Sequence, residues 1–146
     1  MKIVIATDHN GVSEKEIVIN NLSSEYEIID KSTHNTPTDD YPTFAIEVAE
    51  YVSKNEDTIG ILMCGTGIGM SIAANKVKGI RCAHVSSIEE AKLAREHNNA
   101  NIIALSYKNN INDILEMINK VITTPFTNDE RHIRRINIIT NYEKEN

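Results

Sequence analysis

The sequence lacks the features of a membrane or secreted protein. No apolar segment approaches the length needed to cross a bilayer, and the first residues, Met1-Lys-Ile-Val-Ile, do not have the architecture of a signal peptide. Only two cysteines occur, Cys64 and Cys82, and they lack the C-x-x-C spacing, so we expect neither a structural disulfide nor a redox motif. These absences together predict a cytoplasmic protein that does not bind membranes.

Positive charge is also scarce, because 15 Lys and Arg residues stand against 21 Asp and Glu, for a net charge of −6. This balance argues against nucleic acid as the main partner, although small anionic ligands remain possible at local basic clusters. No repeat, low-complexity tract or linker divides the chain. We therefore expect residues 1–146 to form one domain, and a hydrophobic content of 40% is sufficient for a core.

Short apolar runs alternate with helical patterns along most of the chain, which predicts an α/β fold with a parallel sheet and helices on both faces. The expected strands are Lys2–Thr7, Tyr26–Asp30, Thr58–Met63, Gly79–His84 and Asn101–Leu105. The expected helices lie near Ser13–Leu22, Pro42–Lys54, Ile68–Lys76, Ser87–His97 and Ile111–Ile122.

Capping signals support two of these helices. Ser13–Glu16 and Ser86–Glu89 both match the capping box, and Val12 with Ile17 is spaced as a hydrophobic staple. A last helix is expected to start in Thr127–Glu130 and run through Ile136. Residues 140–146 are polar and are expected to fray.

The segment from Asp57 to Asn75 is the most informative part of the chain. An apolar run ends at Cys64, three alternating glycines follow, and a helical pattern begins. Glycines let the backbone turn sharply near a ligand, and a helix start presents unpaired N–H groups to negative charge. The same field favours the thiolate of Cys64, so the segment offers a base or nucleophile beside an oxyanion cradle.

Two better-known phosphate motifs do not fit this loop. A dinucleotide site needs G-x-G-x-x-G and an acidic residue about twenty positions later, whereas the third glycine here comes one residue early and the next strand ends Ala83-His84-Val85. A P-loop needs G-K-[ST], which is absent. The alternative to a catalytic loop is a tight turn beside a buried cysteine.

Other polar residues are expected near the strand ends, where ligands bind in such sheets. Asp8-His9 follows the first strand, and Asp8 is either a site residue or a simple cap. His97 lies at the end of a helix pattern, where the helix dipole favours the imidazolium form. This position suits a general acid, and the alternative is a surface histidine that only complements the dipole. Arg131 and Arg135 share one helix face. Their guanidinium groups either bind a phosphate together or belong to a solvated charged face.

No spacing supports a metal site. A zinc ion held by Cys64, His9 and His97 is conceivable in space, but no ligand motif accompanies these residues. His34, His84 and His132 likewise show no metal-ligand spacing.

Six motifs in order and at matching spacing resemble the ribose-5-phosphate isomerase B family, which includes related allose- and galactose-6-phosphate isomerases. They are Asp8-His9, Asp40-Tyr41-Pro42, Cys64-Gly-Thr-Gly-Ile-Gly-Met-Ser71, Asn75-Lys-Val77 with Gly79-Ile-Arg81, Glu96-His97-Asn98 through Asn101, and Arg131-His132. The similarity runs from Met1 to about Ile139, and the block that begins at Cys64 is highly specific.

The resemblance implies a Rossmann-like three-layer sandwich with a five-stranded parallel sheet, and interconversion of ribose 5-phosphate and ribulose 5-phosphate without metal or organic cofactor. It also implies a homodimer or homotetramer whose active sites are shared between subunits.

The resemblance assigns roles to individual residues. Cys64 is the implied base, His97 the implied acid for opening the sugar ring, and Thr66 a third catalytic residue. Implied substrate contacts are Asp8, Tyr41, Gly65, Gly67, Ile68, Gly69, Ser71 and Asn98, with His9, Arg131 and Arg135 on the phosphate side and the arginines from the partner subunit.

The chain departs from the family pattern at two places. Tyr107-Lys108 stands where many relatives have arginine, and Asn10 replaces a small residue after the Asp-His pair. The alternatives to a ribose-5-phosphate isomerase are an isomerase of allose or galactose 6-phosphate and a non-catalytic sugar-phosphate-binding module.

Overall fold

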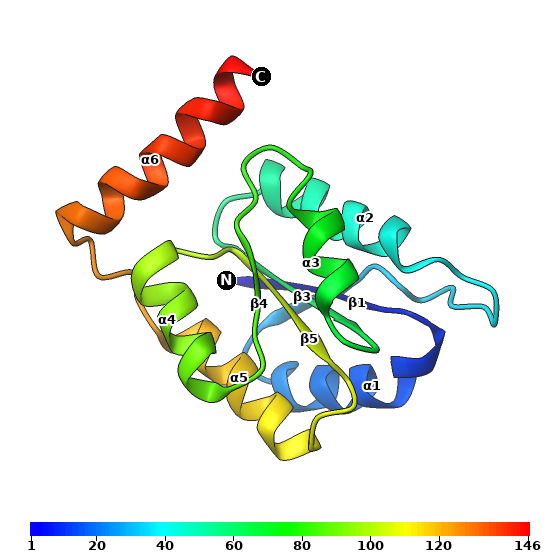
Figure 1. Cartoon of the computed structure of the whole chain (residues 1–146). Helices are drawn as coiled ribbons and strands as arrows, with labels where there is room; N and C mark the ends of the chain where they lie inside the picture. Colours follow the sequence, from blue (N-terminus) through cyan, green and yellow to red (C-terminus); the bar gives the residue numbers. More distant parts are fainter.

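The computed structural model describes residues 1–146 and contains a five-stranded, all-parallel sheet in the order β2-β1-β3-β5-β4 (Figure 1). The strands are β1 (Lys2–Thr7), β2 (Glu27–Asp30), β3 (Thr58–Cys64), β4 (Cys82–His84) and β5 (Ile102–Ser106). The helices are α1 (Val12–Leu22), α2 (Tyr41–Lys54), α3 (Ile68–Ala74), α4 (Ile88–Asn98), α5 (Ile111–Thr123) and α6 (Glu130–Glu145), with a short 3-10 turn η1 (His9–Gly11). The predicted α/β class, parallel sheet and C-terminal helix are confirmed.

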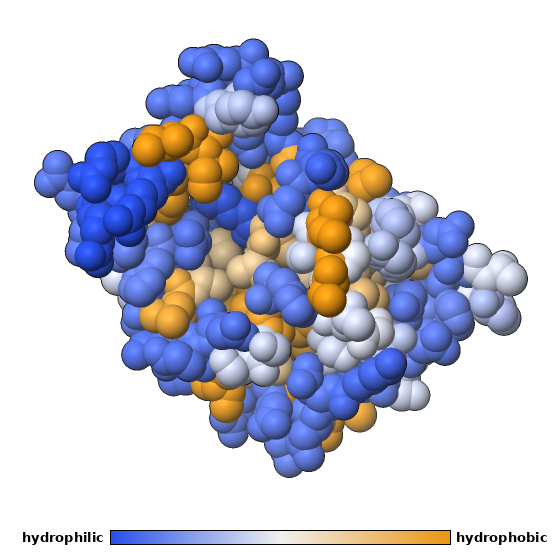
Figure 2. Space-filling view, in the orientation of Figure 1, coloured by the Kyte–Doolittle hydropathy of each residue, from blue (hydrophilic) through white to orange (hydrophobic).

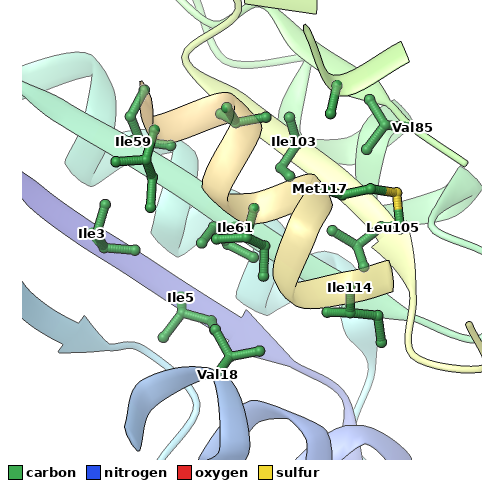
Figure 3. Close-up of a cluster of buried hydrophobic side chains, with 14 of the residues drawn as sticks. Ile3, Ile5, Val18, Ile59, Ile61, Val85, Ile103, Leu105, Ile114 and Met117 are labelled. Atoms are coloured by element: carbon green, nitrogen blue, oxygen red, sulfur yellow. The ribbon is translucent and has the colours of Figure 1, made fainter. Parts of the chain in front are cut away.

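Alternation along the strands divides the core into two clusters, because successive side chains point to opposite faces of a sheet. Ile3, Ile5, Ile61 and Leu105 lie on one face with residues of α1, α4 and α5 (Figure 3). Their neighbours along the same strands pack on the other face against α2 and α3. The molecule is therefore a three-layer sandwich.

The central strand β3 delivers Cys64 to the edge where the site was expected. All seven residues of β3 are buried, which explains its unbroken apolar run. In the register, Met63 is opposite Thr7 of β1, and Cys64 is opposite Ser106 of β5. The carboxyl ends of these three strands therefore meet beside the Cys64 loop.

The helix starts differ from the predicted caps. Gly11, not Ser13, occupies the N-cap of α1, with no side-chain cap bond, and Val12 is already helical, so the predicted box and staple are wrong. The start of α4 uses the predicted chemistry one residue later: Ser87 Oγ accepts from Glu90 N–H at 3.1 Å, and Glu90 Oε1 accepts from Ser86 N–H at 2.8 Å.

The C-terminal helix is longer than predicted and stands away from the sandwich in Figure 1. The polar residues after Ile139, expected to fray, continue α6 to Glu145. The carboxylate of Glu143 accepts a hydrogen bond from Gly79 N–H at 3.1 Å, which ties this end of α6 to the chain before β4. No helix combines the length and apolar character required to cross a membrane.

An ion pair between the buried Lys15 and the partly exposed Asp30 lies beside the end of β1 that leads into the site. Lys15 on α1 is 5% exposed at its side chain, and its Nζ lies 2.9 Å from Asp30 Oδ2 and 2.9 Å from Ser32 O. Ser32 Oγ in turn accepts from Thr7 N–H at 3.1 Å. These contacts join α1, the end of β2 and the end of β1.

Replacing Lys15 with alanine leaves the Asp30 carboxylate without its partner. We expect Lys15→Ala to lower the free energy of unfolding by about 3 kcal/mol, because removal of one member of a buried pair leaves an uncompensated charge. Lys54→Ala is the control, since Lys54 and Glu50 form an exposed pair at 3.2 Å and such pairs contribute about 0.5 kcal/mol or less. Urea unfolding measures both, and equal losses would contradict the assignment.

Candidate functional site

The Cys64 loop, defined here as Cys64–Gly69, is a tight turn between β3 and α3. Cys64 is 6% exposed, and its Sγ accepts a hydrogen bond from Gly67 N–H at 3.1 Å. Gly67 has a φ of 84°, and a Cβ there would lie 2.9 Å from the backbone of Leu105. Glycine at this position therefore permits both the left-handed turn and the close approach to β5.

Side chains around the loop hold its backbone in place. Thr66 Oγ1 accepts from Ile68 N–H at 3.1 Å, and Ser71 Oγ donates to Ile68 O at 2.8 Å. From β5, Ser106 Oγ donates to Gly65 O at 2.7 Å. Thr66, Ile68 and Ser71 thus have an observed local role in shaping the loop, whose later amides begin α3 and have no carbonyl partner within the helix.

Asp8 and two tyrosines lie near the Cys64 loop. Asp8 caps η1 by accepting from Asn10 N–H at 3.0 Å, and the Tyr41 ring lies over Gly69 in the space a side chain would take. Burial raises the pKa of Tyr107, and the negative charge of Asp8 adds to this effect. The phenol of Tyr107 is therefore protonated near neutral pH and faces an acidic side chain.

His9 is held by Asp39, a residue that the sequence reasoning missed. Asp39 Oδ1 lies 2.8 Å from His9 Nδ1 and accepts from His9 N–H at 3.2 Å. Burial acts to raise the pKa of Asp39, but hydrogen bonds from Asn35, His9 and Thr36 bring it below its ordinary value. The ionised carboxylate keeps a proton on Nδ1, so His9 offers its Nε2 to a ligand.

The remaining predicted residues form a second cluster at the C-terminal end of α4. The His97 ring stacks on the His132 ring with centroids 4.3 Å apart and planes at 18°. Burial lowers the pKa of His132, and the nearby His97 and Arg131 lower it further, so this ring is neutral at pH 7. Asn98 ends α4, and Arg131 and Arg135 lie one turn apart on exposed parts of α6.

The two clusters lie at opposite edges of the sheet. Cys64 is in register with Ser106 at the carboxyl end of β5, whereas His97 and Asn98 precede Ile102 at its amino end. The five residues of β5 separate these ends by about 13 Å. Within one chain, His97 therefore does not reach Cys64, and the conceivable zinc ligands Cys64, His9 and His97 do not converge.

The larger hollows of the single chain lie away from Cys64. A cavity of about 560 Å³ opens at the amino edge of the sheet, between Asp57, Arg81 and Arg95 among others, and none of the other larger hollows is lined by Cys64. The Cys64 loop is thus an open shelf in one chain. It carries a thiol, backbone donors and a carboxylate, which suits proton abstraction beside a carbonyl, but His97, the expected acid, lies at the other edge of the sheet.

Asp39 and Ser106, near the shelf, were not predicted as site residues. Tyr107 was noted only as a departure from the family pattern, and His84 only as a histidine without metal-ligand spacing. Ser106 and Tyr107 could have been found, because they follow the fifth apolar run as Cys64 follows the third. Asp39 carried no such signal, since it lies in a loop whose path only the folded chain shows.

Comparison with known proteins gives a consistent result. The family model described as Ribose/Galactose Isomerase matches residues 3–139. Ribose-5-phosphate isomerase B of Mycolicibacterium paratuberculosis is 39% identical over 147 residues, which cover 99% of this chain and 92% of that protein.

Two solved structures are similar over nearly the whole chain. Ribose-5-phosphate isomerase B of Mycoplasma genitalium with bound ribulose-5-phosphate has a TM-score of 0.94 and 41% identity, covering 99% of this chain and 97% of that one. Type B ribose 5-phosphate isomerase of Trypanosoma cruzi has a TM-score of 0.94 and 37% identity, covering 100% of both chains.

The glycine at position 67 provides a test of the loop geometry. An alanine in a left-handed conformation costs about 1–2 kcal/mol, and at Gly67 its Cβ would also press on the Leu105 backbone. Gly79→Ala is the matched control, because Gly79 has a φ of 88° but the nearest atom to its Cβ, in Ser53, is 3.9 Å away. We expect Gly67→Ala to lose clearly more unfolding free energy in urea than Gly79→Ala. Similar losses would show that the approach to β5 does not constrain the loop.

Proposed function

The chain belongs to the Ribose/Galactose Isomerase family and is a sugar-phosphate isomerase, and we propose that it interconverts D-ribose 5-phosphate and D-ribulose 5-phosphate. The observation that carries the proposal is the Cys64 loop, where a sulfur at the end of the central strand lies 3.1 Å from a backbone amide. An aldose–ketose isomerase needs one base that reaches two adjacent carbons and donors aimed at the oxygen that becomes negative. The Cys64 loop supplies both.

In the proposed reaction, the Cys64 thiolate removes the proton from C2 of the open-chain aldose. The electron pair moves toward C1, and the carbonyl oxygen gains negative charge as the enediolate forms. The backbone N–H groups of Gly65–Gly69 that are not bonded to Cys64 Sγ or Thr66 Oγ1 stabilise this oxygen, a type of contact worth roughly 2.7–4 kcal/mol for one donor. The proton then returns from sulfur to C1, while a proton moves from the C2 hydroxyl to the C1 oxygen, and the ketose forms.

Ring opening requires an acid, and we assign this role to His97 of the partner subunit. Cys64 and His97 lie at opposite edges of the sheet in one chain, so a subunit cannot complete its own site. A second copy that places its α4 end over the Cys64 shelf supplies the acid and closes the open side. In this arrangement the partner's Asn98, Arg131 and Arg135 accompany the acid.

Exposed apolar side chains support an assembly of this kind. Ile68 and Ile72, one turn apart on α3, are 51% and 58% exposed, and Ile138 and Tyr142 on α6 are 65% and 67% exposed. Figure 2 shows apolar atoms along α3 and beside α6. A homodimer or a homotetramer would cover these surfaces, which a single chain leaves in water.

The sugar phosphate is proposed to lie between the two halves of the shared site. Asp8, Tyr41 and the loop amides contact hydroxyl groups, and His9 with the arginines from the partner contacts the phosphate. Tyr107-Lys108 belongs to the same shelf, because the Tyr107 hydroxyl and Lys108 Nζ lie within 4 Å of where a Cβ of Gly65 would be. Lys108 offers a point charge to the phosphate rather than the planar fork of an arginine.

Purified protein is expected to turn over ribose 5-phosphate with a higher kcat/KM than allose 6-phosphate or galactose 6-phosphate. Cys64→Ala should lower kcat by about 10²–10⁴-fold, the usual contribution of a general base, while the loop amides still bind the sugar phosphate. Cys82→Ala is the control and should retain activity. Ketose formation measures the rates, and turnover of no pentose or hexose phosphate would refute the proposal.

Mixing two inactive variants tests whether sites are shared. Cys64→Ala and His97→Gln chains, unfolded together and refolded, form mixed dimers with one intact site and one doubly altered site. Random pairing makes half of the dimers mixed, so activity should recover to about a quarter of the native value. Each variant refolded alone is the control. Absence of recovery, with mixed dimers detected by mass spectrometry, would place Cys64 and His97 in different roles.

A further inference from the structure

His84, the last residue of β4, contacts the Cys64 loop from the side. Its Nε2 lies 2.8 Å from the carbonyl oxygen of Thr66. A carbonyl oxygen only accepts hydrogen bonds, so Nε2 carries the proton and donates. The role proposed above for the Cys64 loop does not use this contact.

The acceptor of this bond belongs to the peptide unit that serves the reactive sulfur. The Thr66 carbonyl and the Gly67 N–H form one planar, resonance-coupled amide, and Gly67 N–H donates to Cys64 Sγ at 3.1 Å. A donor on the oxygen of an amide draws charge away from its nitrogen, so the N–H becomes a stronger donor. His84, the Thr66–Gly67 peptide and Cys64 Sγ therefore form a continuous chain of two hydrogen bonds.

We propose that His84 is a positioning residue that promotes the thiolate form of Cys64 through the Thr66–Gly67 peptide. The hydrogen bond holds the peptide with its N–H toward sulfur and makes that N–H a better donor to negative charge. This inference rests on the proposed function, in which the Cys64 thiolate is the base. The hydrogen bond from His84 to the Cys64 loop is to the Thr66 carbonyl, and His84 has no hydrogen bond to the sulfur, so it acts through the peptide.

Other charged and titratable groups surround the two ends of this chain of bonds. Glu90 lies near His84 and is held by Ser86, whose N–H and Oγ lie 2.8 and 2.6 Å from Glu90 Oε1. At the sulfur end, Asp8 and Tyr107 lie nearby. Lys108 reaches the same loop beside Gly65. None of these groups hydrogen-bonds to the Thr66–Gly67 peptide. Among them and His84, only His84 polarises this peptide through a hydrogen bond.

The test is the pH dependence of Cys64 alkylation by iodoacetamide in the full-length protein without substrate. His84→Ala removes the donor, and we expect half-maximal alkylation at higher pH and a rate at pH 7 about three- to tenfold lower, in line with the loss of one hydrogen bond. His84→Gln places an amide N–H near the position of Nε2 and should restore most of the rate. Glu89→Gln, in the first turn of α4, is the control and should behave as the native protein.

The second cysteine does not interfere, because burial raises the pKa of Cys82 to about 12. Thermal unfolding of each variant separates loss of the loop from loss of the donor, since a purely structural role would lower stability without moving the alkylation midpoint. An unchanged midpoint in His84→Ala would overturn the inference, as would equal shifts in His84→Ala and His84→Gln.

Alkylation is independent of turnover, so the two proposals fail separately. A protein that isomerises no sugar phosphate but shows the shift in His84→Ala would refute the proposed function alone. Normal isomerisation with no shift would refute the role of His84 alone.

Discussion

The hydrogen bond from Gly67 N–H to Cys64 Sγ is the interaction on which the rest of the site depends. It forms only because the chain reverses within three residues of the central strand, in a left-handed turn against the backbone of β5. The turn places the sulfur, the loop amides and the start of α3 on one shelf. The neighbouring strands β1 and β5 then bring Asp8, Ser106 and Tyr107 to the same edge.

At the opposite edge of the sheet, arginine side chains hold the end of α4 in place. Arg81 donates to Asn98 O and Asn99 O, both at 2.9 Å, and Arg95 donates to Ala100 O at 2.6 Å. Two guanidinium groups thus satisfy carbonyls at the end of α4, where Asn99 adopts a φ of 46°. The end of the helix that carries His97 is therefore rigid, although the Cys64 shelf of its own chain lies beyond its reach. A well-ordered helix end suits the proposed role of His97 in the site of a partner subunit.

The architecture was predictable because it follows from local patterns. Apolar runs at Lys2–Thr7 and Thr58–Met63 correspond to strands within one residue, and the βα alternation specified a parallel sheet. The helix starts were less predictable. Serine is a common N-cap residue, yet the 3-10 turn after β1 places Gly11, not Ser13, at the N-cap of α1. Tertiary contacts here override a local preference.

By itself, the sequence determined the order of the strands along the chain, the glycine turn at Cys64 and the resemblance to a family of isomerases. These are local features, written in residues close together in the chain. Only the tertiary structure decided that Asp39 holds His9, that His84 reaches the Thr66 carbonyl, and that Cys64 and His97 stand at opposite edges of the sheet. The reason is physical: the direction in which a helix returns across a sheet sets which ends meet, and residue spacing does not record it.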